Sequence, residues 1–361
     1  DCLLSRGLGD VYKRQAYIHA VCSELEMRKE YLGGETIETI YWGGGTPSQL
    51  DKEDFETIFY YLHKNYSISS HPEITLEANP DDLTPDYIAM LRTLPFNRLS
   101  MGIQTFNESI LKVLQRRHTA RQAIEAFQNC RAAGFQNISI DLMYGLPGET
   151  LSTWQQDLDQ ALLLHPEHLS AYHLIYEEDT VLWKLREQHK VEEADEDLSV
   201  SLFSTLIDRL TSEGYDHYEI SNFSLPGLYS RHNSSYWTEK QYLGCGPSAH
   251  SYNGISRQWN VASLDKYIEG ISSGNPTFEV EELDLYTRYN DFVITHIRTQ
   301  WGMPLPKLGK QYGEELYKYC LRMATPHLQQ GTLEIKNDTL KLTRKGVFIS
   351  DGIMSDMLWV E

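Results

Sequence analysis

The sequence predicts an α/β fold, a partial β/α barrel followed by a small C-terminal α+β domain. Short β-rich segments alternate with amphipathic helical segments from Ala16 to about residue 221, which is typical of parallel strands joined by right-handed crossovers. After about Asn275 this alternation stops, and helices precede two short strands around Asn337-Asp338. We therefore expect a barrel with its extension over residues 16–274 and a winged-helix-like domain over residues 275–361.

The barrel region is expected to contain six helices, each followed by a strand. The helices have apolar residues at a period near 3.6, and the strands are short runs of apolar and β-branched residues. The expected helices are 16–31, 51–63, 85–94, 120–133, 151–164 and 195–213, and the strands are 39–42, 73–78, 98–105, 137–144, 168–176 and 216–221. The C-terminal domain is expected to contain helices 283–298 and 307–329, a hairpin within 333–342 and a last helix after Arg344.

The composition excludes several classes of function. With 361 residues and 41% hydrophobic content, the chain can bury a sizeable core. It has 32 basic and 51 acidic residues, and this net charge of -19 disfavours binding to nucleic acid or to anionic membranes, so the winged domain is not expected to bind DNA. No apolar run approaches the roughly 20 residues of a membrane span, and no signal segment is visible. We expect a cytoplasmic protein without a transmembrane segment.

Five cysteines lie far apart and form no CxxC pair: Cys2, Cys22, Cys130, Cys245 and Cys320. This spacing argues against a disulfide framework and against a local zinc site, and it predicts reduced thiols. Residues 1–15, DCLLSRGLGDVYKRQ, show no clean periodicity. We interpret them as a non-native N-terminus and exclude them from the expected fold.

A run of three glycines, Gly43–Gly45, follows the first expected strand in TIETIYWGGGTPSQL. Glycines allow a backbone to approach a ligand closely and to adopt φ values that other residues avoid. Thr46, Pro47 and Gln49 are predicted to be the N-cap, first-turn proline and capping-box residue of a helix. The free amides of such a turn suit a carboxylate or a similar anion. A tight turn without a ligand is an equal alternative.

The next strands each end near a polar residue in an apolar context. Glu77 lies in TLEANP, Gln104 in LSMGIQTF and Asp141 in ISIDLMYGLPGET, while Arg116 follows in LQRRHT. Loops at the C-terminal ends of barrel strands build active sites, and a buried carboxylate needs a partner such as an ammonium group, a hydroxyl or an arginine. Each residue alone is equally consistent with a structural hydrogen bond. Their position on successive strands favours a shared site.

These motifs together carry a family resemblance. GGGTP, LEANP, GIQTFN…LQRRH and IDLMYGLPGET, in this order, resemble the radical S-adenosylmethionine family of oxygen-independent coproporphyrinogen III oxidases and their relatives. The resemblance extends from about Ala16 to the C-terminus and implies a partial barrel of the radical S-adenosylmethionine type. It implies that the methionine part of S-adenosylmethionine contacts Gly44, Gly45 and Thr46. The remaining cofactor-binding residues that it implies are Glu77, Gln104, Arg116 and Asp141.

A second motif indicates one branch of that family. Residues 232–237, HNSSYW, match the HNxxYW signature of the HemW branch, the haem chaperones. The resemblance implies haem as cargo and respiratory haem proteins as recipients.

The residues around this motif agree in part with haem binding. His232 and His250 can ligate iron through imidazole, and Tyr236 and Trp237 can flank a porphyrin, with Asn233 inside the same motif. A hydrogen-bonding anchor is the alternative for each histidine. Cys245, in LGCGPS, is a further thiolate candidate, for which a small buried thiol is the ordinary interpretation.

One departure from the family is large. Its members carry a CxxxCxxC motif whose three thiolates hold a [4Fe–4S] cluster, and that motif is expected upstream of Ala16. The sequence has no such motif there, and neither Cys2 nor Cys22 can substitute for it. The first barrel strand is expected to be missing as well. We predict that the chain as given cannot assemble the cluster, whereas the natural protein carries it.

Three functions are compatible with these observations. The favoured one is a haem chaperone that binds haem and S-adenosylmethionine and transfers haem. The second is a coproporphyrinogen III dehydrogenase of porphyrin biosynthesis, in which an adenosyl radical drives oxidative decarboxylation of propionates. The third is a scaffold without a cluster that binds only haem or a partner. HNxxYW and the shorter chain favour the first; a homodimer is compatible with all three.

Overall fold

The structure, a computed structural model, describes residues 11–178 and 180–360. The chain divides into two compact units. Residues 41–48 and 74–230 form the barrel unit, and residues 11–40, 49–73 and 231–360 form the terminal unit. The dividing points fall within the first two strands. The predicted limits at 15/16 and 274/275 differ from these units and stay predictions.

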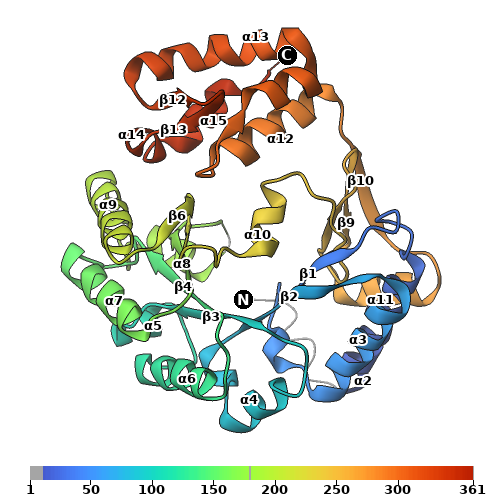
Figure 1. The fold of residues 1–361 in the computed structure, drawn as a ribbon. Coiled ribbons are helices and arrows are strands. Elements are labelled where there is room, and N and C mark those ends of the chain that lie inside the picture. The colour runs from blue at the N-terminus through green and yellow to red at the C-terminus, as the bar shows by residue number, and fades with distance from the viewer. Residues whose placement is uncertain (1–10, 179, 361) are drawn as a thin grey trace. The chain divides into compact units, whose positions relative to one another are not determined.

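A seven-stranded sheet has the order β1-β2-β3-β4-β5-β7-β6 (Figure 1). The strands are β1 Ile37–Trp42, β2 Ile68–Ala78, β3 Arg98–Gln104, β4 Ile138–Tyr144, β5 His168–His173, β6 Asp216–Glu219 and β7 Asn222–Ser224. Strands β2 to β5 are parallel, whereas β7 is antiparallel to both β5 and β6. The predicted partial barrel is confirmed. The expectation of parallel strands throughout is wrong at β7, because three residues are too short to give a periodic signal.

The helices of the barrel unit are α4 Pro85–Leu91, α5 Glu108–Val113, α6 Ala120–Ala132, α7 Leu151–Leu164, α8 Val181–Glu187 and α9 Glu196–Ser212, with the short 3-10 turns η1 Pro47–Gln49 and η2 Pro80–Asp82. Of these, α4, α6, α7 and α9 lie along one side of β3 to β5 in Figure 1. Thr119 and Thr150 begin α6 and α7 with capping boxes, which satisfy free backbone amides. Trp154 of α7 is fully buried, and its indole N–H donates to the carbonyl of Leu202.

Alternation along β4 separates an apolar face from a polar one. Ile138, Ile140 and Leu142 are completely buried. Burying each such side chain contributes about 1.5–3 kcal/mol, so this face fixes the register of the strand. Because successive side chains of a strand point to opposite faces, Ser139 and Asp141 lie on the other face.

The terminal unit begins with α2 Val11–Met27, which packs with α3 Lys52–Asn65. The helix expected from Ala16 therefore begins at Val11. Arg14 forms ion pairs with Asp51 (2.6 Å) and Asp54 (3.4 Å), which join the start of α2 to the start of α3. Of residues 1–15, which were interpreted as non-native, residues 11–15 belong to α2 and residues 1–10 lie outside the described part, so that interpretation stays a prediction.

A second sheet of the terminal unit was not predicted. It has the order β10-β9-β8, with β8 His250–Tyr252, β9 Ser256–Asn260 and β10 Phe278–Glu282, and is accompanied by α10 Arg231–Tyr236 and α11 Leu264–Ser272. Buried Glu24 of α2 connects these elements, because it accepts hydrogen bonds from Tyr267 (2.6 Å), Asn260 (2.7 Å) and Arg28 (3.0 Å). A buried carboxylate is stable only with such partners.

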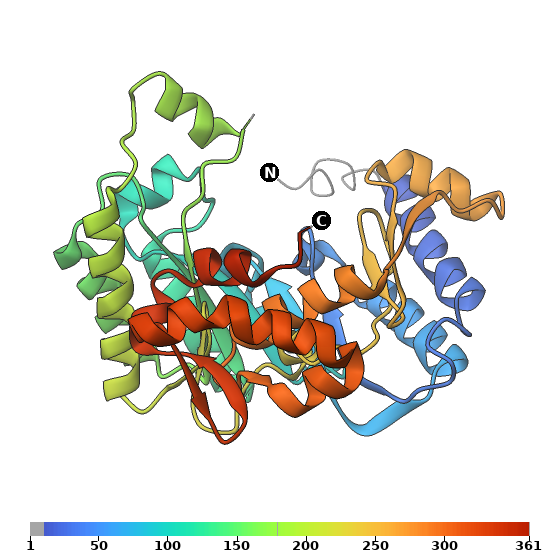
Figure 2. The ribbon, with the colours of Figure 1, turned by 90° about the horizontal axis from the view of Figure 1, so that it is seen from above.

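The C-terminal region agrees with the predicted helices and hairpin. Its elements are α12 Leu285–Ile297, β11 Met303–Pro304, α13 Leu305–Gln330, β12 Leu333–Lys336, β13 Thr339–Leu342, α14 Arg344–Val347 and α15 Ser350–Met357. Asn337 and Asp338 both have positive φ, 50° and 55°, as a two-residue hairpin turn requires. Figure 2 shows the hairpin beside the long helix α13. Within the described residues, no helix has the length and apolar character needed to cross a membrane.

Candidate functional site

The glycine turn after β1 is packed on one side and open on the other. A Cβ atom at Gly43 would lie 2.5 Å from Cε1 of Tyr41 and 2.8 Å from Cδ of Glu77, so this position requires glycine for close packing. Gly44 and Gly45 have φ of 72° and 134°, where side chains are strained. A Cβ atom at Gly44 would meet nothing within 4 Å. The turn therefore presents open space beside Gly44.

The prediction that Thr46 caps the start of a helix is wrong. Pro47–Gln49 form only the 3-10 turn η1, and the α-helix begins at Lys52. Asp51 is its N-cap and forms a capping box with Asp54, so this pair, rather than Thr46 and Gln49, satisfies the first helical amides. Thr46 directly follows Gly45 in the sequence and so lies beside the glycine turn.

Glu77 joins the glycine turn to the neighbouring strand. The hydroxyl of Tyr41 donates to Oε1 of Glu77 (2.6 Å), and the amide of Gly44 donates to Oε2 (3.1 Å). Burial, and then the charges of Glu77 and Asp141, raise the pKa of Tyr41, which keeps its hydroxyl as a donor. Tyr41 is thus a partner of Glu77 that the sequence analysis missed. Its signal was its position two residues before the glycines, at the end of the strand.

Strand register places the predicted carboxylates on one face. Glu77 lies opposite Ser100, and Asp141 lies opposite Gly102 on one side and Ser170 on the other. The hydroxyl of Ser100 is 3.4 Å from Oδ1 and 3.3 Å from Oδ2 of Asp141, to which it donates. Neither serine was predicted, because its role depends on the pairing of distant strands.

Gln104 and Arg116 meet above Gly102. A Cβ atom at Gly102 would lie 3.1 Å from Nε2 of Gln104 and 3.5 Å from Nη2 of Arg116. The pairing of β3 with β4 shifts between Gly102 and Gln104, and Gln104 has φ of 71°, which is strained for a residue with a side chain. Nη2 of Arg116 donates to Oδ1 of Asn79 (2.7 Å) and to the carbonyl of Gly102 (2.9 Å). Since Gly102 pairs with Asp141, Gln104 and Arg116 lie next to the face that carries Asp141.

Two ionisable groups of this face are perturbed. Burial lowers the pKa of Arg116, while the charges of Asp81 and Asp141 act in the opposite direction. Burial, and then the charge of Glu77, raise the pKa of Asp141 to about 6, although hydrogen bonds from Ser170 and Ser100 lower it. Asp141 therefore exchanges its proton near pH 6, and a cation beside it would stabilise the charged form.

If Asp141 faces a cationic ligand, lowering the pH from about 8 to about 5 is expected to weaken S-adenosylmethionine binding, by about tenfold per pH unit at most below 6, because the carboxylate takes up a proton. Asp141→Asn is expected to remove this dependence, and Asp86→Asn, on an exposed residue of α4, to retain it. Isothermal titration calorimetry of the protein with S-adenosylmethionine measures both. Equal pH profiles for the two variants would contradict the assignment.

The stability of the ligand-free protein has a pH dependence of definite sign. Between the ordinary pKa of an aspartate and about 6, the folded state holds the proton of Asp141 while the unfolded state has lost it. The free energy of unfolding therefore falls as the pH rises through this range. Asp141→Asn is expected to be more stable than the unmodified chain above pH 6, as thermal denaturation can measure.

The polar groups and the open space of this face fit S-adenosylmethionine. The molecule carries an ammonium group, a sulfonium, a carboxylate and ribose hydroxyls. Glu77 and Asp141 supply acceptors, and open space lies beside Gly44. Nε of Arg116 is buried and has no hydrogen-bond partner among the described residues, so the arginine retains a donor. The structure thus brings together Gly44, Glu77, Gln104, Arg116 and Asp141.

The described residues do not fit a [4Fe–4S] cluster. Over residues 11–178 and 180–360, no three His, Cys, Asp or Glu side chains are grouped to hold a metal. Burial raises the pKa of the thiols of Cys22 and Cys320 to about 11 and that of Cys130 to about 12, and it raises the pKa of Cys245 strongly. Cluster ligation requires thiolates. Cys2 lies outside the described residues.

The HNxxYW motif is anchored in the terminal unit by Glu73. The two carboxylate oxygens of Glu73 accept hydrogen bonds from the backbone amides of Arg231 (3.0 Å) and His232 (2.8 Å). The guanidinium of Arg231 also pairs with Glu38 of β1 (2.6 Å). Both of these carboxylates come from the strands β1 and β2, so the position of α10 depends on long-range contacts.

Both ring nitrogens of His232 have hydrogen-bond partners. Nδ1 is 2.9 Å from Oγ1 of Thr39, and Nε2 is 3.0 Å from the hydroxyl of Tyr236. The ring of Tyr236 contacts that of Tyr242 edge-on, with centroids 4.8 Å apart, and Tyr242 in turn packs on Tyr252 at 6.1 Å. His232 is therefore the first member of an aromatic series that runs to β8.

The other motif residues differ in their surroundings. The guanidinium of Arg298 lies 4.3 Å from the ring centroid of Trp237. Nε1 of Trp237 and Oγ of Ser234 are buried and have no hydrogen-bond partner in the described part of the chain. Asn233 is half-buried on α10, and exposed His250 stacks on Trp259 with centroids 5.8 Å apart. Aromatic rings, an imidazole and polar atoms without partners fit a porphyrin with its iron and propionates.

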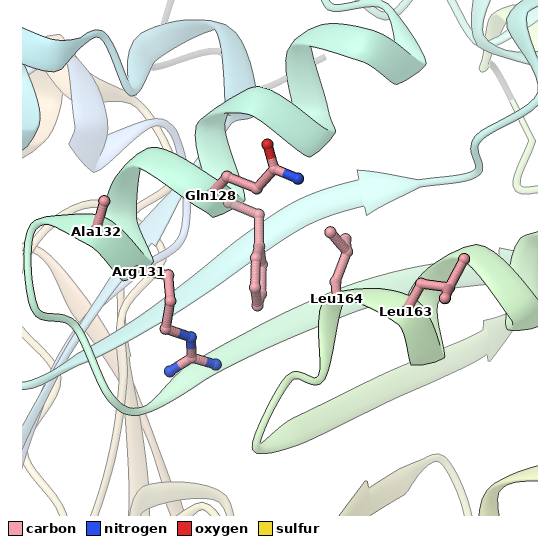
Figure 3. Close-up of a pocket in the computed structure, with 6 residues that line it drawn as sticks. Gln128, Arg131, Ala132, Leu163 and Leu164 are labelled. Carbon is pink, nitrogen blue, oxygen red and sulfur yellow. The ribbon is translucent and has the colours of Figure 1, made fainter.

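A pocket of about 340 Å³ between α6 and α7 is unrelated to these residues (Figure 3). It is lined by Phe127, Gln128, Arg131, Ala132, Leu163 and Leu164. Its charged lining residue, Arg131, pairs with Glu167 at 2.8 Å and donates to the carbonyl of Phe135 at 3.1 Å. None of the predicted site residues lines it.

Comparisons with known proteins agree with this arrangement. Residues 12–161 match the radical SAM superfamily, and residues 283–349 match the HemN C-terminal domain. The chain is 30% identical to the heme chaperone HemW of Bacillus subtilis, covering 95% of this chain and 91% of that protein. It is 31% identical to the heme chaperone HemW of Mycobacterium tuberculosis, covering 95% and 86%. The structure of coproporphyrinogen III oxidase (HemN) from Escherichia coli, a radical SAM enzyme, matches 96% of this chain and 83% of that chain with a TM-score of 0.82 and 22% identity. This last likeness shows the fold alone.

Proposed function

Since the chain belongs to the HemW family of heme chaperones within the radical SAM superfamily, we propose that it binds haem at the HNxxYW motif and transfers it to haem proteins. The observation that carries this proposal is the imidazole of His232, placed between Thr39 and Tyr236 at the start of an aromatic series. An iron ligand, flat apolar surfaces and polar atoms for propionates are what haem recognition needs. Transfer to respiratory haem proteins and a cytoplasmic location are part of this proposal.

A second ligand belongs to the barrel unit. We propose that S-adenosylmethionine lies beside Gly44, with its ammonium group near Glu77 and its remaining polar groups near Gln104, Arg116 and Asp141. When bound, S-adenosylmethionine can supply an adenosyl radical or act as an unreacted effector. The chain's own residues orient it: Tyr41 and Gly44 set the carboxylate of Glu77, and Ser100 sets that of Asp141. Since the described residues do not fit the cluster, no radical step is assigned to them.

Haem titration followed by transfer tests the main proposal. The full-length protein is expected to bind ferric haem with a Soret band and to lose that band when apomyoglobin is added, as the Soret band of holomyoglobin appears. Haem-loaded albumin mixed with apomyoglobin, in the absence of this protein, provides the control for passive exchange of haem. Under reducing conditions with S-adenosylmethionine, no loss of carboxyl groups from coproporphyrinogen III is expected. Turnover of that substrate without haem transfer would instead support the oxidase reaction.

A further inference from the structure

Thr39 lies outside the HNxxYW motif but contacts its histidine directly. Oγ1 of Thr39 is 2.9 Å from Nδ1 of His232, although 193 positions separate the two residues in sequence. Thr39 is half-buried on β1, a strand of the main sheet, whereas Tyr236 is 36% exposed at the end of the six-residue helix α10. The two partners of the imidazole therefore differ in how easily they can move away.

We propose that Thr39 positions His232 for haem iron and that Tyr236 covers the iron-binding nitrogen until haem arrives. In this arrangement Nδ1–H donates to Oγ1 of Thr39, so that Nε2 has a lone pair, which accepts from the hydroxyl of Tyr236. A metal-binding histidine usually donates its second N–H to a fixed acceptor, which sets the tautomer and the ring orientation. Iron then takes the place of the Tyr236 proton on Nε2. The inference rests on the proposed haem-binding function.

The geometry assigns Nε2, rather than Nδ1, to iron. Thr39 lies in a paired strand of the main sheet and is β-branched, which restricts its χ1, so its hydroxyl has few alternative positions. The exposed phenol of Tyr236 can turn away and exchange its bond to Nε2 for one to water, at a small net cost. Glu73 meanwhile holds the backbone amide of His232 at 2.8 Å, so that the start of α10 keeps its place when Tyr236 leaves.

Haem affinity and spectra of three variants of the full-length protein test the inference. Thr39→Val removes the hydroxyl and keeps the branched shape of a strand residue, and it is expected to weaken ferric haem binding by about tenfold or more, with a shifted Soret band. Thr39→Ser retains the hydroxyl and is expected to stay within about twofold of the unmodified protein. Tyr236→Phe is expected to bind haem about threefold or more tightly, because no phenol competes for Nε2.

A background without the imidazole separates positioning from a merely structural role. In His232→Ala, which has no imidazole at this position, Thr39→Val is expected to have no further effect on the remaining haem affinity. An equal loss in that background, unchanged affinity and spectrum in Thr39→Val, or weaker binding in Tyr236→Phe would each overturn the inference. If His232→Ala leaves haem binding unchanged, the proposed haem site itself fails, which is a separate outcome.

Discussion

Gly44→Ala is expected to weaken S-adenosylmethionine binding by at least about tenfold while the protein stays folded. The added methyl group would point into the open space beside the turn, where we place the ligand. The positive φ of 72° also predicts a loss of about 1–2 kcal/mol of stability, since a side chain is strained there. Alanine is preferable to valine because a β-branched residue would add strain unrelated to the ligand.

A matched variant distinguishes strain from ligand contact. Gly214 lies between α9 and β6 in the same unit, has φ of 86°, and its Cβ atom would likewise meet nothing within 4 Å. Gly214→Ala is expected to lose similar stability and to retain S-adenosylmethionine binding. Calorimetric titration and thermal denaturation of both variants measure the two effects. Equal ligand affinity in the two variants would show that the turn does not contact the ligand.

His232→Ala is expected to lower haem affinity by about 10- to 100-fold and to shift the Soret band, because the iron loses its imidazole. The substitution also removes the hydrogen bonds to Thr39 and Tyr236, which costs about 1–3 kcal/mol. Haem titration followed by absorption, with circular dichroism as a check on folding, measures the change.

Two other histidines provide the comparison. His250→Ala is expected to bind haem within about twofold of the unmodified chain, since His250 stacks on Trp259 rather than joining the series that begins at His232. His63→Ala, on the exposed side of α3, controls for general loss of a surface imidazole. A spectrum that changes with His250→Ala and not with His232→Ala would move the site to His250.

Long elements with a clear period were predicted well. Helix α7 has the expected bounds Leu151–Leu164, and the hairpin turn at Asn337 and Asp338 has the expected geometry. Their signals are local: an amphipathic period with a threonine cap, and a two-residue turn between short strands. Strand β7 and the sheet β8–β10 were missed. Strands of three to five residues, one of them with the sequence FEVEE, give no signal that distinguishes them from loops.

The sequence indicated candidate site residues, but not the residues that form hydrogen bonds with them. The motifs pointed to Glu77, Asp141 and His232, and their cofactor roles remain predictions. Tyr41, Ser100 and Thr39 were not predicted, although each contacts one of those three side chains. A tyrosine, serine or threonine in a strand has many possible roles, and its sequence context does not select one.

The sequence alone determined the family, the order of most helices and strands, and the candidate residues of both sites, because periodicity, caps and motifs are properties of short segments. Only the tertiary structure decided which partner each of those residues has. Tyr41 meets Glu77 across 36 positions, and Thr39 meets His232 across 193. Such pairs depend on strand register and on the anchoring of α10 by Glu73. The burial of apolar faces fixes both across a whole unit, so no short segment of sequence encodes them.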